Sequence, residues 1–97
     1  MSDDPVPSFA GVWDALEETP EAAAHLRLRS ELAIAVRGAV DGWGLPQAEA
    51  ARRLGVTQPR LNDLLCDRLA RFSLDALVGL AERAGLTVRL QLGRVAA

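Results

Sequence analysis

The chain has 97 residues, 49% of them hydrophobic but only 4% aromatic, so we expect one small domain with an aliphatic core. This composition favours packed helices over a β-sandwich, and no apolar run reaches the roughly 18 residues that a membrane-spanning helix needs. The acidic start, unlike that of a signal peptide, and the single Cys66 predict a cytoplasmic protein without an internal disulfide.

The net charge of −2 conceals two regions of opposite sign. Residues 1–24, called the acidic arm below, contain six Asp or Glu and no Arg or Lys. Residues 25–97 contain eleven Arg against seven acids. The chain therefore combines an acidic arm with a basic body, and a basic body suits a nucleic-acid partner.

The first predicted element lies in the acidic arm. Phe9, Val12, Trp13 and Leu16 follow helical spacing, which predicts a short amphipathic helix. Two uses of its apolar face stay open. Either Phe9 and Trp13 dock on the core of the domain itself, or the arm binds a protein partner.

Residues 25–97 are assigned to one folded domain, which begins with a helix from Leu28 to about Gly42. Its apolar stripe contains Leu28, Leu32, Ala35, Val36, Ala39 and Val40.

Two short helices are predicted next. The first covers about residues 46–54, with Pro46 tolerated in its first turn and Gly55 as the left-handed residue that ends it. The second is capped by Thr57 and reaches about Cys66.

A fourth helix is expected from Ser73 to Gly85, with Phe72 and Leu77 as its hydrophobic staple. Its predicted buried stripe contains Leu74, Leu77, Val78 and Ala81.

The last predicted element is a strand over residues 87–92, where apolar and polar residues alternate strictly. No second strand is predicted, so its backbone groups need a partner from elsewhere. We expect the strand to pair with that of a second copy, through Val88, Leu90 and Leu92, in a two-fold homodimer. The alternatives are a frayed tail or a return to the acidic arm.

The segment from Gln47 to Cys66 meets the requirements of a helix-turn-helix motif. Two short helices that meet at a steep angle need a small residue at their contact, which is Ala51, and a residue tolerant of positive φ in the turn, which is Gly55. Four apolar residues fix the second helix on the core: Leu54, Val56, Leu61 and Leu64.

The second helix of such a motif places its N-terminal residues in the major groove of DNA. Gln58 suits an adenine edge and Arg60 suits guanine or a phosphate, while Arg71 suits flanking phosphates. We expect Asp63 to hold Arg60 in place, because the two are spaced i, i+3. The full set of candidate DNA-binding residues is Gln47, Arg53, Thr57, Gln58, Arg60, Asn62, Asp63 and Arg68.

The chain resembles the HigA-type antitoxins of the XRE class of helix-turn-helix regulators from Phe9 to Leu92. The segments that carry the resemblance are Val12–Leu16, Leu26–Leu32, Gln47–Ala51, Leu54–Arg60 and Phe72–Leu77. The resemblance implies a lambda-repressor-like bundle of about five helices. It also implies that Gln47, Thr57 and Gln58 contact DNA.

In function, the resemblance implies an antitoxin that neutralises a HigB/RelE-like mRNA-cleaving toxin and represses its own operon through a palindromic operator. Phe9, Val12, Trp13 and Leu16 are then candidates for toxin binding. Two features depart from the family pattern: Pro46 replaces a hydroxyl cap, and Asp67 stands before Arg68 where Gly is usual. Asp tolerates the left-handed conformation, but its charge is expected on the DNA side.

No catalytic role is expected, because one His and one Cys without a surrounding motif support neither a nucleophile nor a zinc site. His25 is expected on the surface and Cys66 to be a small apolar residue. We expect no cofactor, metal, membrane or small-molecule substrate. The alternatives to the antitoxin are a stand-alone XRE-family repressor without a toxin and an adaptor that has lost DNA binding.

Overall fold

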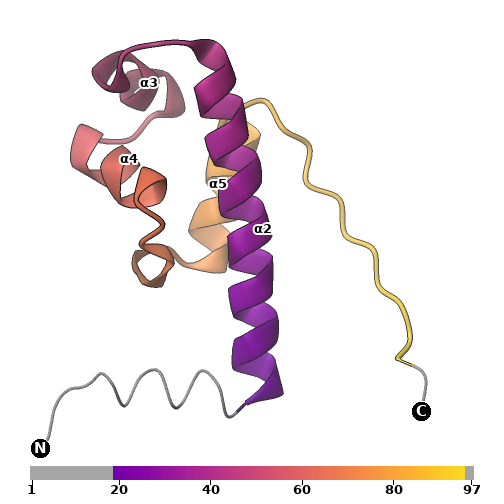
Figure 1. The fold of residues 1–97 in the computed structure, drawn as a ribbon. Coiled ribbons are helices and arrows are strands. Elements are labelled where there is room, and N and C mark those ends of the chain that lie inside the picture. The colour runs from indigo at the N-terminus through magenta and orange to yellow at the C-terminus, as the bar shows by residue number, and fades with distance from the viewer. Residues whose placement is uncertain (1–18, 96–97) are drawn as a thin grey trace, which may run out of the picture.

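The computed structural model describes residues 19–95. These residues form α2 (Pro20–Trp43), α3 (Gln47–Leu54), α4 (Gln58–Leu65), the 3-10 turn η1 (Leu69–Arg71) and α5 (Leu74–Arg83). The long α2 packs against α5, while α3 and α4 pack on each other beside this pair (Figure 1). The toxin-binding candidates in the acidic arm lie outside the described residues. No helix within the described range has both the length and the apolar content to cross a membrane.

The long helix α2 begins eight residues earlier than the sequence pattern predicted. Thr19 is its N-cap, and its Oγ1 accepts a hydrogen bond of 3.1 Å from the backbone N–H of Ala22. Pro20 at the first helical position fits because the missing N–H has no partner there. Residues 20–24, assigned to the arm, are therefore helical, and the start at Leu28 was wrong because the Thr-Pro-Glu start signal was overlooked.

The short helices have the predicted ends. α3 follows Pro46, which makes no side-chain cap, and stops at Gly55 with φ of 80°. The Oγ1 of Thr57 accepts from the backbone N–H of Arg60 at 3.2 Å and so caps α4. Local cap and turn residues thus fix the two helices of the motif.

The last helix also has its predicted start and stop. The Ser73 hydroxyl accepts from the backbone N–H of Ala76 at 3.0 Å, and Gly85 follows the helix with φ of 88°. Phe72, directly before the cap, is buried in the core together with Leu77.

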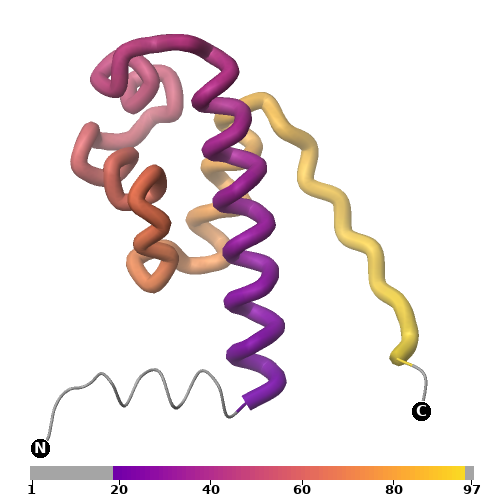
Figure 2. Tube along the Cα trace, viewed as in Figure 1, coloured from indigo at the N-terminus to yellow at the C-terminus, as the bar shows by residue number. Residues whose placement is uncertain are grey.

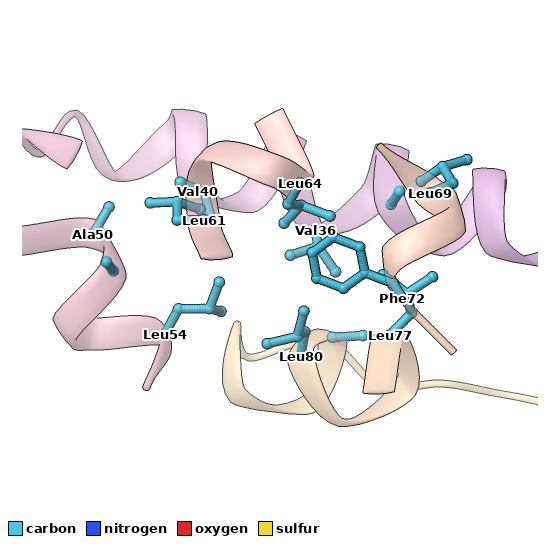
Figure 3. Packing of buried hydrophobic residues seen from close by; sticks show 13 residues of the cluster. Val36, Val40, Ala50, Leu54, Leu61, Leu64, Leu69, Phe72, Leu77 and Leu80 are labelled. Atoms are coloured by element: carbon cyan, nitrogen blue, oxygen red, sulfur yellow. The ribbon is translucent and has the colours of Figure 1, made fainter. Parts of the chain in front are cut away.

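The core lies where α2, α3, α4, η1 and α5 meet, around the ring of Phe72 (Figure 3). Its largest fully buried side chains are Phe72, Leu54, Leu61, Leu64, Leu77 and Val36. The buried stripes of the two long helices differ from those predicted. α2 buries Ala33, Val36 and Val40, and α5 buries Leu77, Leu80 and Ala81.

Several side chains of the predicted stripes line a groove on the neighbouring face instead of the core. Leu28 and Ala35 are exposed, while Leu74 and Val78 are half-buried. With Leu32 and the C-terminal segment they line an apolar groove of about 290 Å³. The error arose because apolar residues cover more of α2 than one helical neighbour can bury.

The C-terminal segment, residues 86–95, forms no strand within the described part of this single chain. It leaves the end of α5 and runs beside α2 as an extended, irregular tail (Figure 2). The predicted strand is therefore not formed here, because within residues 19–95 no other strand lies beside residues 87–92. The N–H of Leu86 donates to the carbonyl oxygen of Ala81 at 2.9 Å, which holds the start of the tail on the end of α5. Leu90 and Leu92 are 82% and 83% exposed.

Candidate nucleic-acid interface

The N-terminal ends of α3 and α4 lie next to each other. Gln58, the first residue of α4, donates a hydrogen bond from Nε2 to Oε1 of Gln47, the first residue of α3, at 3.3 Å. Both side chains lie at the molecular surface. The contact restricts the Gln58 amide and leaves part of its donor and acceptor capacity open to another partner.

The two sides of α4 have different surroundings. Leu61 and Leu64 are almost fully buried and hold the helix on the core. Thr57, Gln58 and Asn62 are exposed on the opposite side. The structure therefore brings together Gln47 and these three predicted residues as one polar, outward-facing surface, which is called the reading face below.

Arg60 lies on a flank of α4 rather than on the reading face. Its guanidinium stacks 3.8 Å from the centre of the Phe72 ring, and its Nη1 donates to the carbonyl oxygen of Arg71 at 2.7 Å. The predicted pairing of Arg60 with Asp63 is wrong, since Arg60 is held by the buried aromatic ring and the η1 backbone instead.

Asp63 lies on the same flank, and its carboxylate accepts from two arginines that follow α4. Its Oδ1 is 2.9 Å from Nη1 of Arg68 and 3.0 Å from Nη1 of Arg71. The Arg68 hydrogen bond, aided by the positive charge of Arg71, holds the pKa of the Asp63 carboxyl below its usual range although partial burial acts to raise it. The same hydrogen bond raises the pKa of Arg68.

Asp67 adopts the left-handed conformation, with φ of 62°, that its position after α4 was predicted to require. Its charge was expected on the DNA side, yet its carboxylate is paired with Arg37 of α2 at 2.9 Å. The same Arg37 nitrogen donates to the carbonyl oxygen of Leu64 at 3.2 Å. Arg37 thereby ties the end of α4 to α2 and partly neutralises the Asp67 carboxylate.

Arg53, a predicted phosphate contact on α3, lies with its guanidinium 4.2 Å from the centre of a Trp43 ring. Trp43 ends α2 and is partly buried against the core. This cation–π contact joins the ends of two helices and fixes the direction of the Arg53 side chain.

Sequence reasoning missed Arg37, Trp43 and Phe72 as supports of this surface. Arg37 meets Leu64 and Asp67 across 27 and 30 positions in the chain, a separation at which helical spacing gives no signal. The aromatic rings carried a weak signal, because a rare aromatic beside Arg-rich segments favours cation–π contacts.

The Cys66 thiol and the possible metal-binding side chains form no site within the part of the chain that the structure describes. Cys66 is exposed rather than packed as an apolar residue, and its thiol donates to Oδ1 of Asn62 at 3.7 Å. Over residues 19–95, no group of three or more His, Cys, Asp or Glu side chains is placed to hold a metal ion.

Comparison with known proteins gives one family. A family model described as a helix-turn-helix domain matches residues 15–93, which is most of the chain. The comparisons with curated proteins and with solved structures gave no significant match.

Proposed function

The chain belongs to this helix-turn-helix domain family, and on that premise we propose that it represses transcription by placing α4 in the major groove of a palindromic operator. The observation that carries the proposal is the Gln47–Gln58 hydrogen bond, which joins two side chains of the exposed polar reading face. An amide that is already oriented loses less entropy when it meets a base edge. Adenine, with its N6 donor and N7 acceptor, is the base that a Gln side chain recognises best.

We assign the remaining candidate DNA-binding residues different roles according to their positions around α4. Asn62, one turn along α4 from Gln58, is the second base reader. Thr57, at the helix start, contacts a phosphate or the adjoining base. Arg53, Arg68 and Arg71 flank the reading face and bind phosphates. Arg60 and Asp63 support this surface from the side and contact no base.

The test is fluorescence anisotropy with operator DNA selected from random sequence by the protein itself. Gln58→Ala should weaken operator binding by about 5- to 150-fold, the range for one bidentate base contact, and leave random DNA nearly unaffected. Gln91→Ala is the matched control and should change neither affinity, because its side chain alternates with Val88, Leu90 and Leu92 and lies on the opposite side of the tail from them. Equal losses on operator and random DNA would remove Gln58 as a base reader. No salt-dependent DNA binding by the wild-type chain would overturn the function itself.

A palindromic operator requires a two-fold dimer, and the tail and groove supply apolar surface for one. Val88 and Leu90 line the groove between α2 and α5, and Leu92 continues their alternation. In the proposed dimer the two tails pair as strands, so that their backbone groups bond each other and these side chains cover the groove. Leu90→Arg should convert the dimer to monomer in sedimentation. An unchanged mass would overturn this interface.

The partner proposed for the acidic arm is a basic, RelE-like mRNA-cleaving toxin. The resemblance to HigA-type antitoxins supports this, and so does charge: the arm carries six acids, and an enzyme that binds RNA must attract a polyanion. Affinity purification of the tagged chain from its host, followed by mass spectrometry, tests the pairing. Recovery of a small basic ribonuclease in equal amount supports the antitoxin. Recovery of the chain alone supports the stand-alone repressor.

A further inference from the structure

The three residues of one cluster, Asp63, Arg68 and Arg71, are arranged with the acid inside and the bases outside. The Asp63 side chain is 16% exposed, whereas those of Arg68 and Arg71 are 47% and 61% exposed. Both Arg Nη1 atoms share the single oxygen Oδ1 of Asp63. Seen from solvent, the cluster therefore presents two guanidinium groups that rest on a partly covered carboxylate.

The backbone around the cluster is fixed as well. The N–H of Arg68 donates to the carbonyl oxygen of Asp63 at 2.9 Å. The carbonyl of Arg71 accepts from Arg60, whose guanidinium is stacked on the buried Phe72 ring. The side chain of Arg71 is thus held by Asp63 and its backbone by Arg60, two residues of α4.

The cluster retains the capacity to bind an anion. Each guanidinium has five N–H donors, and Asp63 takes one Nη1 contact from each arginine. With one acid and two bases, the cluster also keeps a net positive charge. Arg side chains of this kind bind phosphate through two parallel hydrogen bonds, and fixing them beforehand lowers the entropy lost on binding.

We infer that Asp63 is a positioning residue, which aims Arg68 and Arg71 at backbone phosphates beside the groove that α4 enters. The inference rests on the proposed DNA binding and adds a role for an acid that its charge alone would make unfavourable there. Asp63 touches neither base nor phosphate. It acts through the two arginines, so its effect depends on their presence.

The sign of one substitution tests the inference. Asp63→Asn keeps the size of the side chain but removes its charge. If Asp63 merely repels DNA, this change raises affinity. If Asp63 positions the arginines, affinity falls by about 3- to 10-fold on operator and random DNA alike, because phosphate contacts carry no sequence information. The slope of log affinity against log salt should also become shallower, by up to about one phosphate contact.

A double-mutant cycle separates positioning from a structural role. In the Arg68→Ala/Arg71→Ala background, Asp63→Asn should no longer weaken binding. A loss of the same size in that background overturns the inference, as does a gain of affinity in the single variant. The matched control is Glu82→Gln, an exposed acid-to-amide change on α5, which should alter affinity by less than about twofold.

A second variant covers the case in which Asp63→Asn fails to fold. Arg68→Lys/Arg71→Lys keeps both charges but loses the planar fork that Asp63 orients. It should weaken binding about as much as Asp63→Asn, and unchanged affinity would overturn the inference. Wild-type DNA binding is measured in the same assay. Its absence would contradict the proposed function, whereas wild-type binding together with unchanged binding of the variants would contradict only the inference about Asp63.

Discussion

The motif formed by α3 and α4 and the C-terminal segment, residues 86–95, are opposite cases of how a sequence specifies structure. In the motif, each helix end is set by a residue within a few positions: Gly55 stops α3 and Thr57 caps α4. The tail has an equally clear pattern of alternation, yet it forms no strand in the described chain.

The difference teaches which patterns are sufficient by themselves. A cap or a left-handed turn is completed by neighbouring backbone, so the sequence that encodes it also contains its partner. A strand is completed only by another strand, and alternation does not provide one. Matched substitutions in the two regions, which share Leu, Gly and Thr, measure this contrast.

The largest expected effect is on core packing. Leu61→Ala removes a side chain that is 1% exposed and should lower the free energy of unfolding by about 2–5 kcal/mol. Leu90→Ala makes the same chemical change at a position that is 82% exposed, and should cost less than about 0.5 kcal/mol in the monomer. Urea unfolding at low protein concentration measures both. Equal losses would show that the tail packs as part of the domain.

Next in size is the turn between the two helices. Gly55 has φ of 80°, so Gly55→Ala should destabilise the fold by about 1–2 kcal/mol through backbone strain. A Cβ there would lie 3.5 Å from Nη1 of Arg83, an ordinary contact, so crowding adds little. Gly93→Ala, in the tail, meets no atom within 4 Å and should be neutral. A neutral Gly55→Ala would mean that the turn adopts another conformation.

The helix cap should contribute somewhat less. Thr57→Ala removes the acceptor for the Arg60 N–H and should cost about 1 kcal/mol. Thr87→Ala changes an exposed residue of the tail and should leave the midpoint of thermal unfolding unchanged. Thr57→Ser keeps the hydroxyl acceptor and should restore most of the loss. A Ser variant as unstable as the Ala variant would assign the effect to the methyl group.

The sequence predicted the four helices of the domain and the turn positions, because caps, glycines and apolar spacing are local signals. It placed the start of α2 at Leu28 rather than Pro20 and overlooked the capping role of Thr19. It also included Leu28 and Ala35 in the apolar stripe of α2, although both are exposed. An apolar stripe shows that a helix has a buried side, but only the neighbouring helices decide which residues that side includes.

The site was predicted less completely than the fold. Gln47, Thr57, Gln58 and Asn62 gather as expected because the motif itself fixes their relation. The partners of Asp63 were assigned wrongly, because helical spacing favoured Arg60 at i+3 and its real partners follow the end of α4. Beyond the end of the helix, helical spacing no longer predicts which side chains meet, and the conformation of the loop determines which charged groups pair.

The smallest expected effect is the pH dependence of this pairing. The pKa of Asp63 is lowered in the folded chain, chiefly by its hydrogen bond with Arg68, so the unfolded chain binds its proton more readily. The resulting stabilisation is fully present above the ordinary carboxyl pKa of 3.8 and is lost as pH falls through the lower folded value. The stability difference between wild type and Asp63→Asn should therefore be constant near neutral pH and shrink in acid.

Arg68→Ala should largely abolish this acid dependence, because it removes the main cause of the shift in the Asp63 pKa. A stability difference that stays constant at acid pH would show that the pairing of Asp63 with Arg68 and Arg71 does not stabilise the folded chain in solution.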